Sequence, residues 1–190
     1  MWEALTAVGT IASAVVIAVT VVMASRQVRL TADQLEQLRR ATQFQGAMAI
    51  FQEQTSPVFW GGIRFVMTEL KERMTDEAFR NEVALVGMAD DNIHKELIIL
   101  RAFDNIGLYV KQRLIESEVI YSSPVFVRAI LGWEALQDVI AVHRKSLGPW
   151  MWGNYEYLYI EGKRWAARNG RSLDLRSVVQ RIEASARRET

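Results

Sequence analysis

Residues 5–24 read LTAVGTIASAVVIAVTVVMA, a run of twenty residues without a charged side chain. An α-helix of that length, at a rise of about 1.5 Å per residue, measures about 30 Å, the thickness of a bilayer's hydrocarbon core. We therefore expect residues 1–25 to form a single transmembrane helix. The alternatives are a helix buried in a soluble protein and a signal peptide cleaved after Ala24. A signal peptide needs a basic N-terminal region and a shorter apolar core, and this segment has neither.

The residues that flank the apolar run predict its orientation. Residues 1–3 carry no Lys or Arg, whereas Arg26, Arg29, Arg39 and Arg40 follow the run. Lys and Arg close to a membrane span favour the cytoplasmic side, and Trp2 is typical of the membrane interface. We expect a bacterial inner-membrane protein with its N-terminus outside and its C-terminal domain in the cytoplasm.

Small and hydroxyl-bearing residues recur along one face of the apolar run. In lipid, such residues let helices approach closely and form interhelical hydrogen bonds worth about 0.6–2 kcal/mol each. If several copies assembled, this face would line a narrow polar path. The alternative is an anchor without partners, because Ser and Thr also bond to their own helix. The residues of this oligomer or pore face are Thr6, Gly9, Thr10, Ser13 and Thr20.

Residues 26–55 are expected to continue the helix as a stalk, because they contain no Pro and are rich in strong helix formers. Val28, Leu35 and Leu38 recur there, with threonines between and after them, at alternating spacings of three and four. This pattern is typical of the seam of a short coiled coil, or of a helix packed on its own domain.

Residues 56–170 carry helical periodicity and helix-start signals at Ser56-Pro57, Thr75-Asp76-Glu77 and Ser123-Pro124, and no alternation typical of strands. We expect an all-α fold, with a cytoplasmic bundle of about five or six helices. The helices expected here cover residues 57–73, from about 77 onward, 90–114, 124–145 and 150–167, with a short capped turn at 117–121.

The composition excludes several kinds of chemistry. The net charge is +1, there is no Cys, and the two histidines are His94 and His143. Disulfides and cysteine-based zinc sites are therefore excluded, and no phosphate-binding glycine loop, nucleophile elbow or metal-ligand spacing is present. We predict no catalytic, cofactor-binding or metal-binding residues, no cofactor, no small-molecule substrate and no enzymatic activity.

In HEPN-type nucleases an Arg precedes the catalytic His, whereas here His94 precedes Arg101. We therefore expect His94 to pair with Asp90 or Asp91 instead of taking part in catalysis.

Two surfaces are candidates for partner binding. Trp150, Trp152 and Tyr155, together with Arg164 and Arg168, form one, unless the aromatic side chains close the core. The other is the basic tail, residues 171–190, which anionic lipid or RNA would attract unless it is simply a solvated segment.

The segment LRAFDNIGLYVK, residues 100–111, follows the apolar run and the stalk RQVRLTADQLEQLRR. With these features, the chain resembles a bacterial family of small single-pass membrane-anchored helical proteins, classed as a domain of unknown function. That resemblance covers nearly the whole chain and implies an anchor and a helical domain, without an activity. It is carried by Leu100, Phe103, Asp104, Ile106, Gly107, Val110 and Lys111.

The plan is also similar to the small membrane-pore accessory protein of some RNA-targeting CRISPR systems, which joins one span to a HEPN-like bundle and oligomerises. The first hypothesis is therefore a membrane-anchored interaction or homo-oligomerisation protein that binds further copies of itself or a protein partner. The second is a homo-oligomeric pore or effector in antiphage defence. The third, which leaves nucleic acid open as a partner, is a membrane-tethered HEPN-like RNA-binding protein or ribonuclease.

Overall fold

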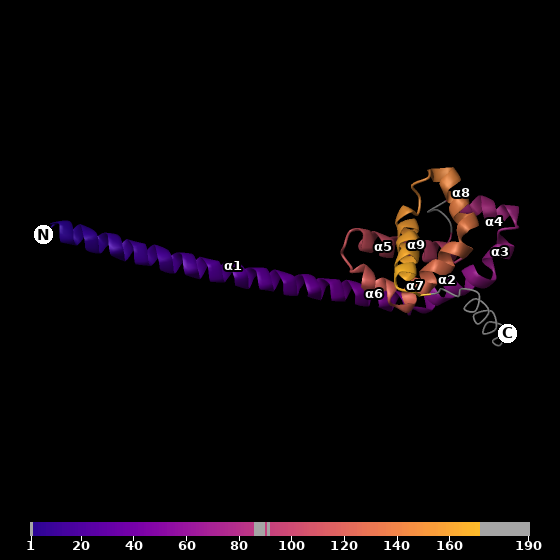
Figure 1. The fold of residues 1–190 in the computed structure, drawn as a ribbon. Coiled ribbons are helices and arrows are strands. Elements are labelled where there is room, and N and C mark those ends of the chain that lie inside the picture. The colour runs from indigo at the N-terminus through magenta and orange to yellow at the C-terminus, as the bar shows by residue number, and fades with distance from the viewer. Residues whose placement is uncertain (1, 86–89, 91, 172–190) are drawn as a thin grey trace. The chain divides into compact units, whose positions relative to one another are not determined.

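The computed structural model describes residues 2–85, 90 and 92–171, and for residues 2–16 and 18 only the backbone. Every regular element in this part of the chain is a helix, which confirms the all-α class (Figure 1). The chain forms two compact units, residues 1–44 and 45–190. The helices are α1 (Trp2–Gln54), α2 (Pro57–Thr68), α3 (Leu70–Arg73), α4 (Glu77–Val83), α5 (Glu96–Lys111), α6 (Ser117–Tyr121), α7 (Pro124–Ala135), α8 (Gln137–Leu147) and α9 (Gly153–Arg168).

The first unit consists of α1 up to residue 44, and all described side chains from residue 19 to residue 42 are exposed. Within the described residues, no helix is both long enough and apolar enough to cross a membrane. The side chains of Thr6, Gly9, Thr10 and Ser13, assigned above to an oligomer or pore face, lie outside the described residues, as do most of those expected to span the bilayer. Thr20 of that face is described and exposed.

The second unit begins within α1, because the end of that helix belongs to the bundle core. Ala47, Ile50 and Gln54 are buried there, and Gly46 lies against Ile115. The compact unit that contains the bundle therefore begins at Gln45, within the stalk expected over residues 26–55.

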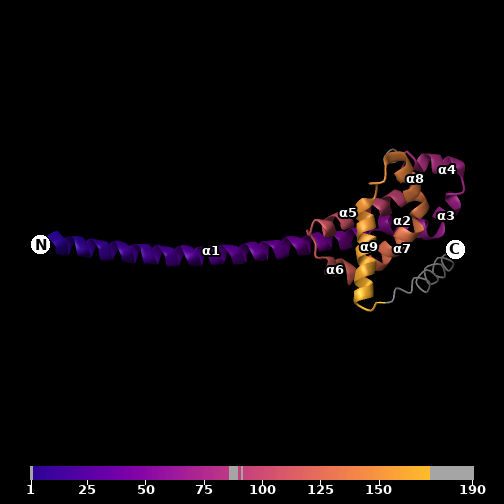
Figure 2. The ribbon, with the colours of Figure 1, turned by 45° about the horizontal axis from the view of Figure 1, so that its top comes forward.

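Helix α5 provides the centre of the bundle, with α9 on one side and α2 beside it (Figure 2). Its buried side chains repeat at helical spacing and include Leu97, Leu100, Phe103 and Ile106. The Phe103 ring stacks on Tyr155 of α9, with 5.1 Å between the ring centroids. Burial of this apolar face, at about 25 cal/mol per Å², is the main favourable term in the stability of the unit.

The expected helix starts are confirmed where the signal is local. The side chains of Ser56, Asp76 and Ser123 each accept a hydrogen bond from a backbone N–H in the first turn of the following helix. Pro57 and Pro124 occupy the first helical positions, where the missing N–H has no partner to lose.

Four expected helices differ in extent, and the last of them, expected from residue 150, begins at Gly153. The helix 57–73 is interrupted at Glu69, and the helix expected from residue 90 begins at Glu96. The helix 124–145 is divided at Leu136, whose backbone leaves the helical region (φ −93°, ψ 4°) while its side chain is fully buried. Burial of that side chain outweighs local helical propensity. The described bundle therefore holds α2 to α9 rather than five or six helices.

The junction between α5 and α9 depends on Asp104 and Gly107. Helix α9 has no local side-chain cap, and the Asp104 carboxylate instead accepts hydrogen bonds from the backbone N–H groups of Asn154 (3.1 Å) and Tyr155 (3.0 Å). A Cβ atom at Gly107 would lie 2.0 Å from the carbonyl oxygen of Asn154. Two residues of the motif 100–111 therefore have a structural role, namely to seat the start of α9.

Candidate functional site

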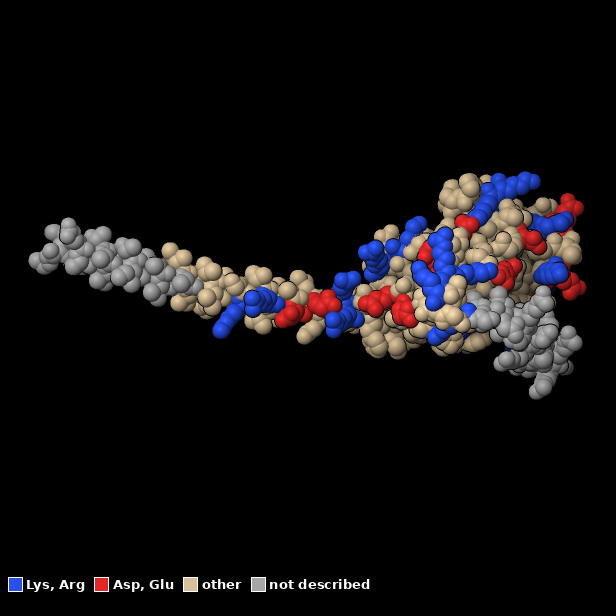
Figure 3. All heavy atoms as spheres, viewed as in Figure 1, with Lys and Arg blue, Asp and Glu red and all other residues tan. Residues whose placement is uncertain are grey.

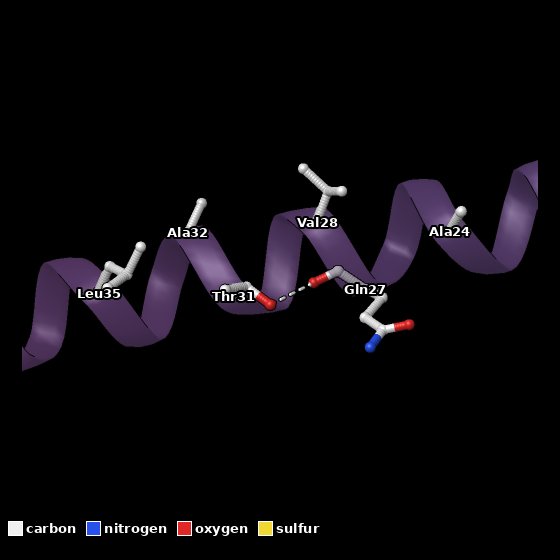
Figure 4. Close-up of a pocket in the computed structure, with 6 residues that line it drawn as sticks. All are labelled: Ala24, Gln27, Val28, Thr31, Ala32 and Leu35. Carbon is white, nitrogen blue, oxygen red and sulfur yellow. Dashed lines mark hydrogen bonds between the residues drawn. The ribbon is translucent and has the colours of Figure 1, made fainter.

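The strongest candidate for an interaction surface is a stripe along α1 that we call the α1 seam. Its apolar residues are strongly exposed: Val28 by 68%, Leu35 by 62% and Leu38 by 64%. The pocket drawn in Figure 4 is an open surface of α1 alone, and Val28, Ala32 and Leu35 project from one side of the helix there. The seam consists of Ala24, Val28, Thr31, Leu35, Leu38 and Thr42.

The threonines of the seam satisfy their own hydroxyl groups. Thr31 Oγ1 donates to the carbonyl oxygen of Gln27 at 2.9 Å, as Figure 4 shows, and Thr42 Oγ1 donates to that of Leu38 at 2.9 Å. A hydroxyl bonded in this way needs no water or partner. Both residues can therefore lie in an apolar interface without an unsatisfied polar group.

Charged side chains lie away from the seam. If Val28 is the first position of a heptad, the six charged residues between 24 and 44 avoid all seam positions. Five of them occupy the second and sixth heptad positions, which point away from a coiled-coil partner, and one, Arg39, flanks the seam. Glu36 and Arg40 pair with each other at 3.0 Å on this outer face. The charged side chains of this part of α1 follow one another along the helix in Figure 3.

The aromatic and basic surface proposed from the sequence is only partly a surface. Trp150 is 70% exposed, and Arg164 and Arg168 are exposed, with Arg164 donating to Glu161. Trp152 and Tyr155 are buried, with exposures of 8% and 0%, and they belong to the core instead. The basic residues of the tail beyond Arg171 lie outside the described residues.

His143 explains the burial of Trp152. The Trp152 Nε1–H donates to His143 Nδ1 at 2.8 Å, and the other ring nitrogen of His143 donates to the carbonyl oxygen of Val83 at 2.9 Å. Burial lowers the pKa of His143 to about 4, so its imidazole is neutral at physiological pH. Trp152 adopts a left-handed backbone conformation (φ 61°) that no local sequence signal indicated.

His94 lies between two carboxylates, neither of which belongs to Asp90. Its Nδ1 is 2.8 Å from Glu96 Oε1, and its Nε2 is 3.1 Å from Glu82 Oε2. His94 and Glu96 are buried, with exposures of 1% and 0%, and the His94 ring stacks on Phe79. Asp90 contributes only its backbone carbonyl, to the N–H of His94, and Asp91 lies outside the described residues.

This cluster of His94, Glu96 and Glu82 does not resemble a nuclease site. Both nitrogens of His94 are occupied and its ring is buried, so the ring does not reach a phosphate group in this conformation. Within the described part of the chain, no group of three or more His, Asp or Glu side chains could hold a metal ion.

Sequence reasoning missed the partners of His94 because Glu82 lies twelve residues before it, a separation without helical periodicity. Glu96, two residues after His94, was the only local signal. Comparison with protein-family models, curated proteins and solved structures found no match for this chain.

Proposed function

We propose that this chain is a single-pass membrane-anchored protein that self-associates through the α1 seam and carries a helical bundle, without enzymatic turnover. The observation that carries the proposal is the segregation of exposed apolar side chains and charges on α1. Val28, Leu35 and Leu38 occupy one stripe, from which charged residues are excluded.

The membrane part of the proposal rests on residues 5–24. Their uncharged sequence matches the length of a bilayer-spanning helix, and the backbone from Trp2 onward is helical. Arg26 and Arg29 follow the run directly, which favours a cytoplasmic location for the bundle of a bacterial inner-membrane protein.

The partner that fits the α1 seam is a second copy of the chain. Copies inserted with the same orientation have parallel helices, so that each seam residue meets its counterpart. Identical charges would then repel if they lay on the seam, and they lie elsewhere. Complete burial of a Leu or Val side chain contributes about 1.5–3 kcal/mol. The three exposed apolar residues of the seam are therefore sufficient to favour a weak association between two copies. Confinement of both copies to one membrane raises their effective concentration and strengthens this association.

The first experiment tests the anchor alone. Washing membranes with sodium carbonate or high salt should leave the full-length chain in the membrane fraction, and detergent should release it. Recovery of the intact chain in a soluble fraction without detergent would contradict the anchor, whatever the oligomeric state.

The second experiment tests the seam, and it uses the absence of cysteine from the chain. Single substitutions Val28→Cys and Leu35→Cys should give disulfide-linked dimers on mild oxidation in native membranes, because these positions meet across a parallel pair. The matched control is Leu30→Cys, since Leu30 is 63% exposed but lies off the seam. Equal dimer yields at all three positions, or none at any, would overturn the proposed interface.

A homo-oligomeric pore is the second candidate, favoured by the hydroxyl-bearing face of Thr6, Thr10, Ser13 and Thr20 in the sequence. The likeness to the pore-forming accessory proteins of RNA-targeting CRISPR systems, which suggests a role in antiphage defence, points the same way. Expression should then collapse the membrane potential, either by itself or once phage is present. The variant Thr10→Val should restore the potential, while Leu30→Ala should not. An unchanged potential in both conditions would contradict this candidate.

A further inference from the structure

We propose that His94, Glu96 and Glu82 form a buried proton-binding site whose single shared proton holds α4 against the bundle. The site joins three elements of the second unit: Glu82 on α4, His94 in the turn before α5, and Glu96 at the start of α5. Both ring nitrogens lie within hydrogen-bond distance of a carboxylate, at 2.8 Å and 3.1 Å, and two of the three side chains are almost fully buried.

The hydrogen bonds fix the number of protons in the site. An imidazole flanked by two carboxylates can keep both bonds only if a proton lies in each. Three arrangements satisfy this: an imidazolium that donates to both carboxylates, or a neutral His94 that accepts a hydrogen bond from either a protonated Glu96 or a protonated Glu82 and donates to the other carboxylate. All three contain the same number of protons, so one proton beyond that of a neutral imidazole is shared among the three side chains. Burial raises the pKa of Glu96, which agrees with a carboxyl group that retains its proton.

Loss of the shared proton must break one of the two bonds. The remaining ring proton can face either Glu96 or Glu82, and the other carboxylate then faces a nitrogen lone pair. Glu96 is fully buried, and its Oε2 has no hydrogen-bond partner among the described residues, so its charge needs the ring proton most. The Glu82 side chain is 56% exposed and can be solvated by water. The bond to α4 is therefore the one that is lost.

The surroundings of the site attach α4 to the bundle at two further points. Phe79 stacks on His94 with 4.6 Å between ring centroids, and Val83 accepts a hydrogen bond from His143 of α8. Helix α4 lies beside α8 in both ribbon views (Figures 1 and 2). The titratable groups that face the shared proton in the described structure are Glu82 from α4, Glu96 from α5 and His143 from α8. His143 is neutral, so Glu82 and Glu96 carry the charge that matters.

Hydrogen exchange of the full-length protein in mild detergent, measured from pH 6 to pH 9.5, tests this inference. After correction for intrinsic exchange rates, the protection of the α4 amides should fall as the pH rises, by up to about tenfold per pH unit, over the interval in which the site keeps its proton when α4 is docked and loses it when α4 opens. Amides of α5 and α9 should show no such fall. Constant protection of α4 across this range would overturn the proposal.

Three variants separate the site from general destabilisation. Glu96→Gln supplies a permanent N–H to His94 and should abolish the pH dependence while keeping α4 protected. Glu82→Ala should give low protection of α4 at every pH. The control Glu77→Gln changes another exposed glutamate of α4 and should behave as the wild type. If Glu96→Gln follows the wild-type curve, the proposal is overturned. Imidazole ¹⁵N shifts of wild-type His94 provide an independent test, since they report the folded site and should change at the pH at which the fall in α4 protection levels off.

Discussion

His143 is a single residue on which two elements depend. Its Nε2–H donates to Val83 of α4 and its Nδ1 accepts from Trp152, so only the neutral tautomer with its proton on Nε2 fits. Protonation would place an N–H of His143 against the N–H of Trp152. Together with burial, this mismatch explains why the pKa of His143 is lowered to about 4.

The lowered pKa of His143 predicts acid destabilisation. An unfolded histidine binds a proton below about pH 6.5, whereas folded His143 does so only near pH 4, so stability is lost as the pH falls through this window. Between pH 7 and pH 5 the free energy of unfolding should fall by about 2 kcal/mol because of this residue. Urea titrations followed by Trp fluorescence at both pH values measure this change.

The matched variant for this prediction is His143→Gln, because an amide can donate to Val83 and accept from Trp152 without titrating. It should lose stability at pH 7 but show a smaller decrease between pH 7 and pH 5. A wild-type decrease that persists unchanged in His143→Gln would assign the effect to other groups.

Among the described elements, α5 and α9 contact each other most extensively. The first turn of α9 needs an acceptor for its free N–H groups and room for its backbone. Asp104 provides the acceptor, and the missing side chain of Gly107 provides the room. Helix α9 is thus positioned by α5 rather than by its own N-terminal sequence.

Substitution of Gly107 should therefore destabilise the bundle, whereas an exposed helical glycine should tolerate alanine. In Gly107→Ala the new methyl group would collide with the backbone of Asn154, at a cost of about 3 kcal/mol. Gly61 of α2 has no atom within 4 Å of an added Cβ, so Gly61→Ala should be neutral or stabilise by up to about 1 kcal/mol. Thermal unfolding of both variants measures the difference, and similar melting temperatures would contradict the proposed close approach.

Elements defined by local signals could be predicted from the sequence, and those defined by distant contacts could not. Ser56, Asp76 and Ser123 begin helices because their side chains bond to backbone groups two or three residues away. The division at Leu136 depends on the core into which its side chain packs. Trp152 points inward because of a hydrogen bond to a residue on another helix, so its sequence position could not distinguish surface from core.

For the whole molecule, the charge next to the apolar run predicts a defined topology. A single cysteine in place of Asp33, an exposed position that follows the first arginines, should react with a membrane-impermeant maleimide only after the cells are permeabilised. A cysteine in place of Glu3 should react in intact cells. Labelling of Asp33→Cys in intact cells would reverse the proposed orientation.

The α1 seam could be predicted from the sequence, whereas the proton-binding site could not. The α1 seam follows from a repeat that can be read along one helix, and its apolar residues are exposed as a free interface requires. The proton-binding site combines Glu82, His94 and Glu96 from two helices and a turn. Only tertiary packing brings those side chains together, so periodicity alone did not identify them.

The cap that Asp104 supplies to α9 also constrains the order in which the chain is assembled during synthesis. The acceptor emerges from the ribosome about fifty residues before the amides it serves. In a nascent chain that ends within α8, the Asp104 carboxylate on α5 still lacks the α9 amides that donate to it. Conversely, an isolated peptide that begins at Trp150 should fray at its first turn, so α9 becomes a stable helix only when it docks.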